Sequence, residues 1–323
     1  MKARRIVVLD GATLDPGDNP WAGLASLGEL RVHGHSQPAE IVPRASGAAV
    51  VVTNKASLTA EVVERLVDLR FVAVTATGVN VVDLAATSRR GIPVSNVPEY
   101  GTDSVAQHTI GLLLELAIGI GEHGAAVQRG DWVRSRDFCF WRRPLVELAG
   151  LTFGIVGFGR IGRRVGELAH ALGMRVIATP HRAGAGPVPP WTGFAWRTVG
   201  EVFREADVVS LHCALGADNQ RFVDRELLAT MKPGAWLLNT ARGGLVDEAA
   251  LAEALAAGTI AGAGLDVVAS EPMAPGSPLL AAPRCLVTPH NAWATLAARR
   301  RLMQTTVANV RAFFDGTPIN VVG

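Results

Sequence analysis

The sequence predicts an α/β protein with two domains, each a doubly wound parallel sheet. Short apolar runs alternate with helical segments in both halves of the chain, which is typical of parallel strands joined by crossover helices. A glycine turn, Gly157-Phe158-Gly159-Arg160-Ile161-Gly162, stands mid-chain between an apolar run and an amphipathic helix. The length of 323 residues also suits two domains.

The first part of the chain alternates strand and helix. Strands are predicted at residues 6–9, 49–53, 71–74 and 91–94. A helix is predicted at 58–67, with Ser57 as its N-cap. The pattern breaks near Val97-Pro98-Glu99-Tyr100-Gly101, which marks a domain boundary, and one long helix is predicted over 103–127.

The second part opens with the glycine turn and alternates again. A helix is predicted at 163–172, another at 248–257, and a last helix at 295–314 that could pack back on the first domain. A surface loop rich in glycine and proline is expected at 183–190. Strands are predicted at residues 175–179, 208–211, 235–239, 261–266 and 286–288.

Composition excludes several function classes. Apolar residues make up 49% of the chain, and the net charge is only +2, from 31 basic and 29 acidic residues, so no nucleic-acid or membrane partner is indicated. Arg299-Arg300-Arg301 is expected to form a solvated helix face. The three cysteines are too few and too scattered for a disulfide framework or a zinc site, so we expect no metal and a reducing cytoplasm. The apolar helix near 110–120 contains Glu115, and we expect it to be buried or at an interface.

The glycine turn suits a dinucleotide pyrophosphate. Gly157 and Gly159 permit a tight turn and close approach of backbone N–H groups to phosphate, and Gly162 lets the helix pack on the strand. A glycine turn alone is weak evidence, because many such turns only connect a strand to a helix. Here the strand and the helix stand where the motif requires them.

Three residues with acid–base or carboxylate-binding chemistry follow separate predicted strands. Arg242, Glu271 and His290 are each placed just past a strand, at the sheet edge where ligands bind in such folds. The planar fork of an Arg suits a carboxylate, although a surface salt bridge would explain Arg242 alone. A carboxylate beside an imidazole fixes its tautomer, as a residue that gives and takes a proton requires.

The chain resembles the D-isomer-specific 2-hydroxyacid dehydrogenases over nearly its whole length. The motifs that carry the resemblance are residues 157–162, 239–248, 264–272 and 289–295. Within that family it is most similar to the glycerate dehydrogenase and hydroxypyruvate–glyoxylate reductase branch. Residues 76–83, 96–107, 138–141 and 292–294 carry this closer likeness.

The resemblance implies a domain plan and catalytic roles. A Rossmann NAD(P)-binding domain at 100–293 would be inserted into a flavodoxin-like substrate domain at 1–99 plus 294–323, with the active site in the cleft. Arg242 would hold the substrate carboxylate and keto oxygen, His290 would deliver the proton, and Glu271 would orient His290.

The resemblance also implies binding residues outside that catalytic set. The backbone N–H groups near Gly78 and Val79, beside Thr77, would bind the substrate carboxylate. Asn54 and Lys55 would face the same site, with a solvated turn as the alternative. The implied cofactor contacts are Thr102, Gly157, Gly159, Arg160, Ile161, Gly162, His181, Arg182, Cys213, Ala214, Thr240, Ala241 and Asp266.

Two positions depart from the family pattern. Pro180 stands where relatives that use NAD have an acidic residue on the ribose 2′-hydroxyl, and Arg182 could bind a 2′-phosphate, so NADP is favoured over NAD. The alternative is that Arg182 is a solvated loop residue and that either cofactor is accepted. Ala214 replaces a common proline, which could soften its loop.

We therefore expect an oxidoreductase that reversibly reduces a small 2-ketoacid, glyoxylate or hydroxypyruvate, to the D-2-hydroxyacid with NAD(P)H. The alternatives are the same chemistry on another acid, such as 3-phosphoglycerate or formate, and a non-catalytic protein that senses a dinucleotide. A homodimer is expected, with the helix after Asp103 at its interface. Trp141 would either reach the neighbouring subunit's site or belong to the interface core.

Overall fold

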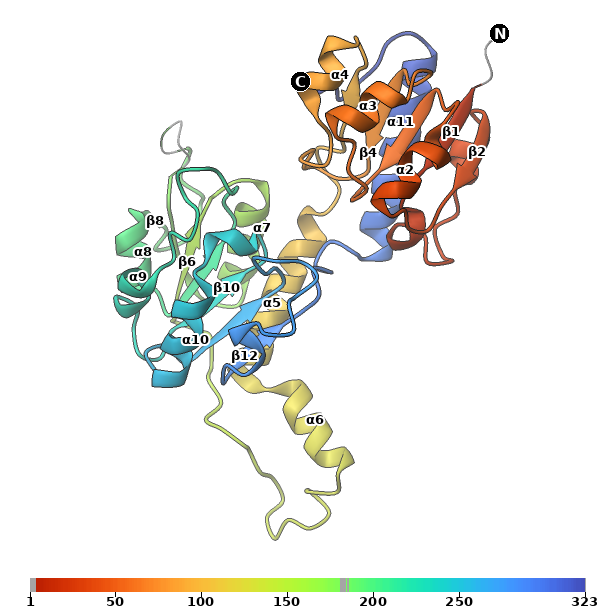
Figure 1. The fold of residues 1–323 in the computed structure, drawn as a ribbon. Helices are drawn as coiled ribbons and strands as arrows, with labels where there is room; N and C mark the ends of the chain where they lie inside the picture. Colours follow the sequence, from red (N-terminus) through yellow and green to blue (C-terminus); the bar gives the residue numbers. More distant parts are fainter. Residues whose placement is uncertain (1–3, 181–183, 185, 323) are drawn as a thin grey trace. The chain divides into compact units, whose positions relative to one another are not determined.

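In a computed structural model, which describes residues 4–180, 184 and 186–322, the chain divides into two compact units (Figure 1). Unit 1 comprises Met1–Gly101 and Ala294–Gly323, and unit 2 comprises Thr102–Trp293. The sequence prediction placed these divisions after residues 99 and 293.

Unit 1 contains a five-stranded parallel sheet in the order β2-β1-β3-β4-β5, which is the flavodoxin-like order. Apolar runs such as Val50-Val51-Val52 are buried because helices cover both faces. Its strands are β1 (Arg5–Val8), β2 (Glu29–Val32), β3 (Val50–Thr53), β4 (Phe71–Val74) and β5 (Val94–Ser95). Its helices are α1 (Ala22–Ala25), α2 (Pro38–Ala45), α3 (Ala60–Arg65), α4 (Leu84–Arg89) and α11 (Leu296–Phe314).

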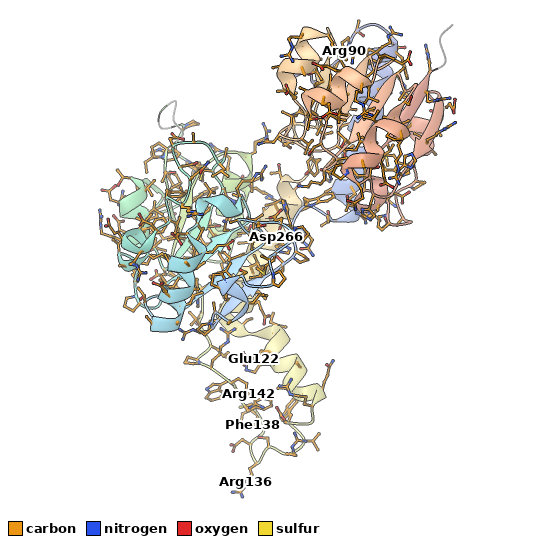
Figure 2. All side chains as sticks on the ribbon, in the orientation of Figure 1. Arg90, Glu122, Arg136, Phe138, Arg142 and Asp266 are labelled. Atoms are coloured by element: carbon orange, nitrogen blue, oxygen red, sulfur yellow. The ribbon has the colours of Figure 1, made fainter. Side chains whose placement is uncertain are left out.

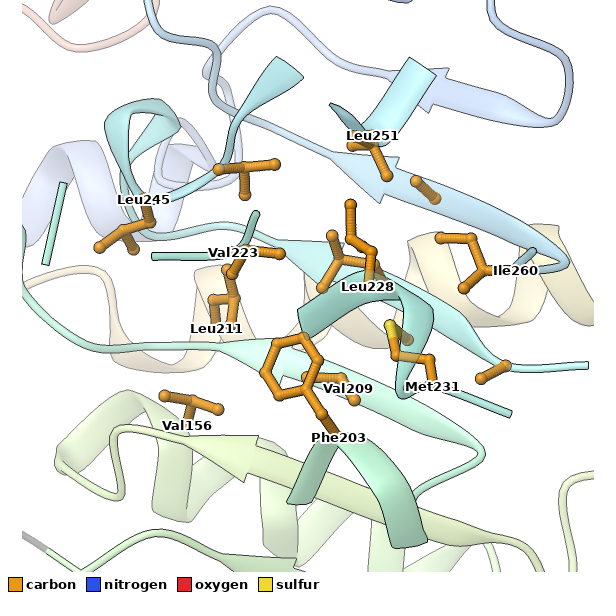
Figure 3. Close-up of a cluster of buried hydrophobic side chains, with 14 of the residues drawn as sticks. Val156, Phe203, Val209, Leu211, Val223, Leu228, Met231, Leu245, Leu251 and Ile260 are labelled. Atoms are coloured by element: carbon orange, nitrogen blue, oxygen red, sulfur yellow. The ribbon is translucent and has the colours of Figure 1, made fainter. Parts of the chain in front are cut away.

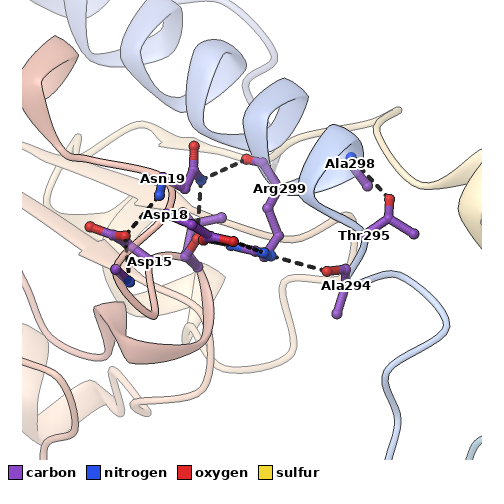
Figure 4. Close-up of polar contacts among 9 residues, drawn as sticks. Asp15, Asp18, Asn19, Ala294, Thr295, Ala298 and Arg299 are labelled. Carbon is purple, nitrogen blue, oxygen red and sulfur yellow. Dashed lines mark hydrogen bonds and ion pairs between the residues drawn. The ribbon is translucent and has the colours of Figure 1, made fainter.

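The last helix, α11, packs on the sheet of unit 1, where Phe313 stacks on Phe71 of β4. Its arginine cluster corrects one expectation. Arg299 is 7% exposed and is not part of a solvated face. Its guanidinium binds the Asp18 carboxylate, with an Nη2–Oδ2 distance of 2.8 Å, and holds the pKa of Asp18 below its ordinary value (Figure 4). No sequence pattern marks this partner, which lies far away along the chain.

Unit 2 contains a seven-stranded parallel sheet in the order β12-β11-β10-β9-β6-β7-β8. Counted from β6, this is the Rossmann order, so the predicted fold class is confirmed in both units. Its strands are β6 (Thr152–Val156), β7 (Arg175–Ala178), β8 (Ala195–Trp196), β9 (Val208–Leu211), β10 (Trp236–Asn239), β11 (Gly262–Leu265) and β12 (Cys285–Val287). Its helices are α5 (Thr102–Ile118), α6 (Ile120–Gln128), α7 (Arg160–Ala171), α8 (Val199–Glu205), α9 (Arg225–Ala229) and α10 (Glu248–Ala257).

Two apolar layers fix the sheet of unit 2. On one face, residues of α8, α9 and α10 such as Phe203, Leu228 and Leu251 pack on the strands (Figure 3). On the other face, α5 and α7 cover the sheet, and Leu113 and Val165 lie in that layer. This sandwich holds the carboxyl ends of the strands in one row, where the candidate site lies.

The prediction of a single helix over 103–127 is wrong. The segment breaks at Gly119, which adopts φ 58°, and forms two helices, α5 and α6, with a bend of 60° between them. In the described part of the chain no single helix has the length and hydropathy of a membrane span, although α5 and α6 taken together pass that test. Helix α6 and the loop after it project away from the sheet of unit 2 (Figure 1).

Two smaller differences between prediction and structure concern a helix cap and an edge strand. Thr59, and not Ser57, caps helix α3, since its side chain accepts a hydrogen bond from the Val62 N–H. The sequence prediction missed strand β2, which lies at the sheet edge and is mostly exposed, so it lacks the apolar run of a buried strand.

Candidate active site

The glycine turn joins β6 to α7 at the point where the strand order of unit 2 reverses. Gly157 adopts φ 97°, and a Cβ on it would lie 2.4 Å from the backbone nitrogen of Cys213. Its N–H donates to the Thr179 hydroxyl over 3.0 Å. A Cβ on Gly162 would lie 2.3 Å from the Gly157 carbonyl oxygen. These two positions therefore require glycine for the fold itself.

Gly159 differs from these two glycines. It has an ordinary φ of −82°, and a Cβ on it would meet no atom within 4 Å. It is the N-cap of α7, and as a glycine it supplies no side-chain cap to the helix. The N-terminus of a twelve-residue helix that begins in this way fits an anionic pyrophosphate. Arg160 and Ile161, also predicted cofactor contacts, form its first turn.

The end of β7 carries no acidic side chain. Thr179 is buried and Pro180 is exposed, and neither can bind a ribose hydroxyl as a carboxylate does. His181 and Arg182, the predicted 2′-phosphate contacts, lie outside the described residues.

The remaining predicted cofactor contacts lie along the same edge of unit 2. Cys213 and Ala214 follow β9, where Asn219 Nδ2 donates to the Ala214 carbonyl over 2.8 Å. Thr240 follows β10, and its hydroxyl lies 2.9 Å from that of Thr109. Ala241 follows Thr240, Thr102 begins α5, and Asp266 follows β11.

His212 also lies at the end of β9, and the sequence prediction assigned no role to its imidazole. Its Nε2 lies 2.8 Å from the Ser210 hydroxyl. Burial lowers the pKa of His212 to about 3, so this imidazole is neutral at physiological pH.

Arg242 is exposed in the turn after β10. Its Nη1 donates to the Ala241 carbonyl over 2.7 Å, and it forms no ion pair with any carboxylate that the structure describes. The alternative for Arg242, a surface salt bridge, is therefore not found among the residues that the structure describes. Gly243 beside it packs against the next loop, since a Cβ there would lie 1.9 Å from the Val268 carbonyl carbon.

His290 and Glu271 form a pair. The His290 Nδ1 lies 2.6 Å from Glu271 Oε2, and both side chains are about one third exposed. A carboxylate only accepts, so Nδ1 carries the proton and Nε2 is left as the proton-exchanging atom. The other oxygen, Oε1, accepts from the Val268 N–H over 3.2 Å.

Three residues that support loops near the predicted site residues carried no role in the sequence interpretation. Gly243 is one, and Glu248, whose Oε1 accepts from the Ala269 N–H over 2.6 Å, is another. The third, Asp10, supports a different loop, that of residues 54–56 in unit 1. The double glycine after Arg242 was a usable signal for the first. Nothing in the sequence marks the backbone partners of the two acids.

In unit 1, Asp10 changes how Asn54 and Lys55 can act. It follows β1, and its carboxylate accepts from the backbone N–H groups of Asn54, Lys55 and Ala56. Those N–H groups are therefore occupied, and we expect Asn54 and Lys55 to contact a ligand through their side chains.

Gly78 and Val79 lie in the loop after β4. Within the described chain, no acceptor lies in hydrogen-bond range of their N–H groups, so both are available to a carboxylate. The neighbouring loop is fixed, because the Thr77 hydroxyl donates to the Val97 carbonyl over 2.9 Å and Asn96 Nδ2 donates to the Thr77 carbonyl over 2.7 Å.

The comparison with known proteins decides the family. Residues 110–292 match the family model described as D-isomer specific 2-hydroxyacid dehydrogenase, NAD binding domain. The chain belongs to this family. It is 44% identical, over 98% of its length and 99% of the relative's, to a hydroxypyruvate reductase of Blautia hydrogenotrophica. It is 43% identical to a glycerate dehydrogenase of Methylorubrum extorquens, over 88% of each.

A solved structure has the same fold. The TT0316 protein of Thermus thermophilus superposes with a TM-score of 0.84 and 38% identity, over 99% of this chain and all of that one. This dehydrogenase is therefore an oxidoreductase with a nicotinamide dinucleotide-binding domain, and the predicted family and branch are confirmed.

Proposed function

We propose that this dehydrogenase reversibly reduces a small 2-ketoacid, hydroxypyruvate or glyoxylate, to the D-2-hydroxyacid. The observation that carries the proposal is the His290–Glu271 pair, which lies two strand ends away from an Arg242 without a carboxylate partner in the described chain. The hydroxypyruvate reductase and glycerate dehydrogenase relatives favour this substrate class.

The residues divide the work of the reaction. A bound nicotinamide dinucleotide supplies the hydride, and the glycine turn with the N-terminus of α7 would hold its pyrophosphate. The Arg242 guanidinium binds the substrate carboxylate and stabilises the negative charge that develops on the keto oxygen. His290 gives its Nε2 proton to that oxygen, and Glu271 stabilises the protonated imidazole until this proton has been transferred. In the reverse direction Nε2 accepts the proton.

A panel of acids tests this proposal. The purified protein is given NADPH or NADH with hydroxypyruvate, glyoxylate, pyruvate, 3-phosphohydroxypyruvate and carbon dioxide, and the loss of nicotinamide absorbance is followed. We expect the highest kcat/KM with hydroxypyruvate or glyoxylate. No turnover with any acid, together with tight dinucleotide binding, would favour the sensing protein instead.

We also propose a preference for NADP over NAD. No carboxylate follows β7 to repel a 2′-phosphate, and Arg182 follows Pro180 in sequence. The ratio of kcat/KM for NADPH to that for NADH tests the preference. Pro180→Asp restores the acid and is expected to lower this ratio at least about tenfold. A wild-type preference for NADH would contradict the proposal.

A homodimer built on the projecting arm is the third proposal. The arm comprises α6 and the loop to residue 149, and in Figure 2 Phe138 and Arg142 lie on it. Val133 and Phe138 are each 89% exposed and Trp141 is 64% exposed, which is costly for a monomer in water. The loop is nonetheless ordered by charge, since Asp131 forms ion pairs with Arg134 and Arg142. A second copy of the chain would cover these side chains.

A further inference from the structure

Asp266 holds the backbone turn that carries His290. This buried side chain follows β11 (Figure 2). Its Oδ1 accepts from the Asn291 N–H over 3.0 Å and its Oδ2 from the Ala292 N–H over 2.9 Å. Its carbonyl oxygen accepts from the His290 N–H over 2.8 Å. Asp266 therefore accepts hydrogen bonds from three consecutive backbone N–H groups, those of His290, Asn291 and Ala292.

The turn needs such a hold because His290 adopts φ 50°. A residue with a Cβ is disfavoured in this left-handed region, so the turn would relax if its hydrogen bonds were lost. The conformation sets the direction of the imidazole, and with it the position of Nε2. Asp266 is also a predicted cofactor contact, and this second role stays a prediction.

The carboxylate of Asp266 is held in turn by Thr288 and, through Thr288, by His108 of α5. The Thr288 hydroxyl donates to Asp266 Oδ1 over 2.6 Å. A hydroxyl has one proton, so the contact of 2.9 Å between Thr288 Oγ1 and His108 Nε2 is one in which the imidazole donates. His108 Nε2 also lies 3.5 Å from Asp266 Oδ1. The imidazole thus carries a proton on Nε2 and directs it toward this pair of oxygens.

The packing of α5 fixes where His108 lies. A Cβ on Gly264 of β11 would lie 3.1 Å from the Leu112 Cβ, so the helix approaches the sheet closely at that strand. One residue after His108, the Thr109 hydroxyl contacts Thr240 at the end of β10. Helix α5 therefore reaches the ends of neighbouring strands with two consecutive side chains.

We propose that His108 is a positioning residue for the reaction, which acts through Thr288 and Asp266 on the turn of His290. This inference rests on the proposed function, because a positioned Nε2 matters only where a proton is transferred. It adds a residue of α5 that the sequence interpretation did not single out. A purely structural role would require only that His108 fill space.

Four variants separate these roles. His108→Leu fills the space and removes the donor, while His108→Gln retains an N–H donor at a similar reach. Thr288→Val removes the hydroxyl that links His108 to Asp266, while Thr288→Ser keeps this hydroxyl. We measure kcat and KM for hydroxypyruvate and NADPH, and amide hydrogen exchange of the peptide over residues 288–293 by mass spectrometry, with a peptide of β4 as the reference.

We expect His108→Leu and Thr288→Val to lower kcat about tenfold or more at an unchanged KM for NADPH, and to speed exchange only in the 288–293 peptide. His108→Gln and Thr288→Ser are expected to restore both. Wild-type kcat and exchange in His108→Leu would overturn the proposal, and so would faster exchange throughout the chain. If the wild type reduces no 2-ketoacid, the proposed function fails, and the exchange rates alone decide whether His108 fixes the turn.

Discussion

At the scale of single residues, the proton of His290 is placed by one carboxylate. Glu271 Oε2 lies 2.6 Å from His290 Nδ1, which leaves Nε2 for the proposed proton transfer. Glu271→Gln retains the size of the side chain but removes the charge that stabilises the imidazolium, so we expect kcat to fall about a hundredfold or more. Stopped-flow turnover with hydroxypyruvate measures this, with NADPH fluorescence titration as the control for binding. A wild-type kcat in this variant would remove Glu271 from the mechanism.

The glycine turn gives a matched pair of substitutions. Gly157→Ala places a Cβ 2.4 Å from the Cys213 nitrogen at φ 97°, and we expect it to cost about 1–3 kcal/mol in the free energy of unfolding. Gly159→Ala meets no protein atom, so its stability is expected to stay within about 0.5 kcal/mol of wild type. Its methyl group would nevertheless lie at the proposed pyrophosphate site, so we expect the NADPH Kd to rise about tenfold or more.

Urea unfolding and NADPH titration distinguish the two glycines. Equal Kd values for Gly159→Ala and wild type would show that the dinucleotide does not approach this helix end.

At the scale of an element, the loop after β9 makes unit 2 sensitive to acid. Unfolded His212 has the ordinary pKa of 6.5, whereas burial lowers its folded pKa to about 3. The unfolded state therefore binds a proton first, and stability falls as the pH drops from 6.5 toward 3, by at most about 1.4 kcal/mol per pH unit. We expect His212→Gln to flatten this part of the stability curve, measured by urea unfolding at a series of pH values. A parallel slope in both proteins would contradict it.

At the scale of the whole molecule, the proposed homodimer depends on the projecting arm. Phe138 and Trp141 are exposed in the chain by itself, and a second copy would bury them. We expect light scattering after size exclusion to give twice the chain mass for wild type. Phe138→Asp with Trp141→Asp should give a folded monomer, because neither residue belongs to the core of the chain. A wild-type monomer at micromolar concentration would refute the dimer.

Much of this architecture follows from periodicity in the sequence. The strands of both sheets read as apolar runs because helices cover both faces, and the order of elements around Gly157 predicted the Rossmann unit. The candidate residues Arg242, Glu271 and His290 could be placed because each follows a strand. The break at Gly119 was missed, since an isolated glycine is tolerated in many helices.

Contacts between distant segments could not be predicted in the same way. Arg299 binds Asp18, and Asp10 occupies the amides of Asn54 and Lys55, because the fold brings these segments together. No periodicity or spacing in the sequence records such a pairing. The same reason kept the link between His108 and Asp266 out of the sequence interpretation.

The most direct test of the central claim is the kcat of His290→Ala with hydroxypyruvate and NADPH, measured beside the NADPH Kd of the same variant. We predict that kcat falls by about 10²–10⁴-fold while Kd stays at the wild-type value, because the imidazole transfers a proton and does not hold the dinucleotide. A kcat equal to that of wild type would contradict the proposed mechanism.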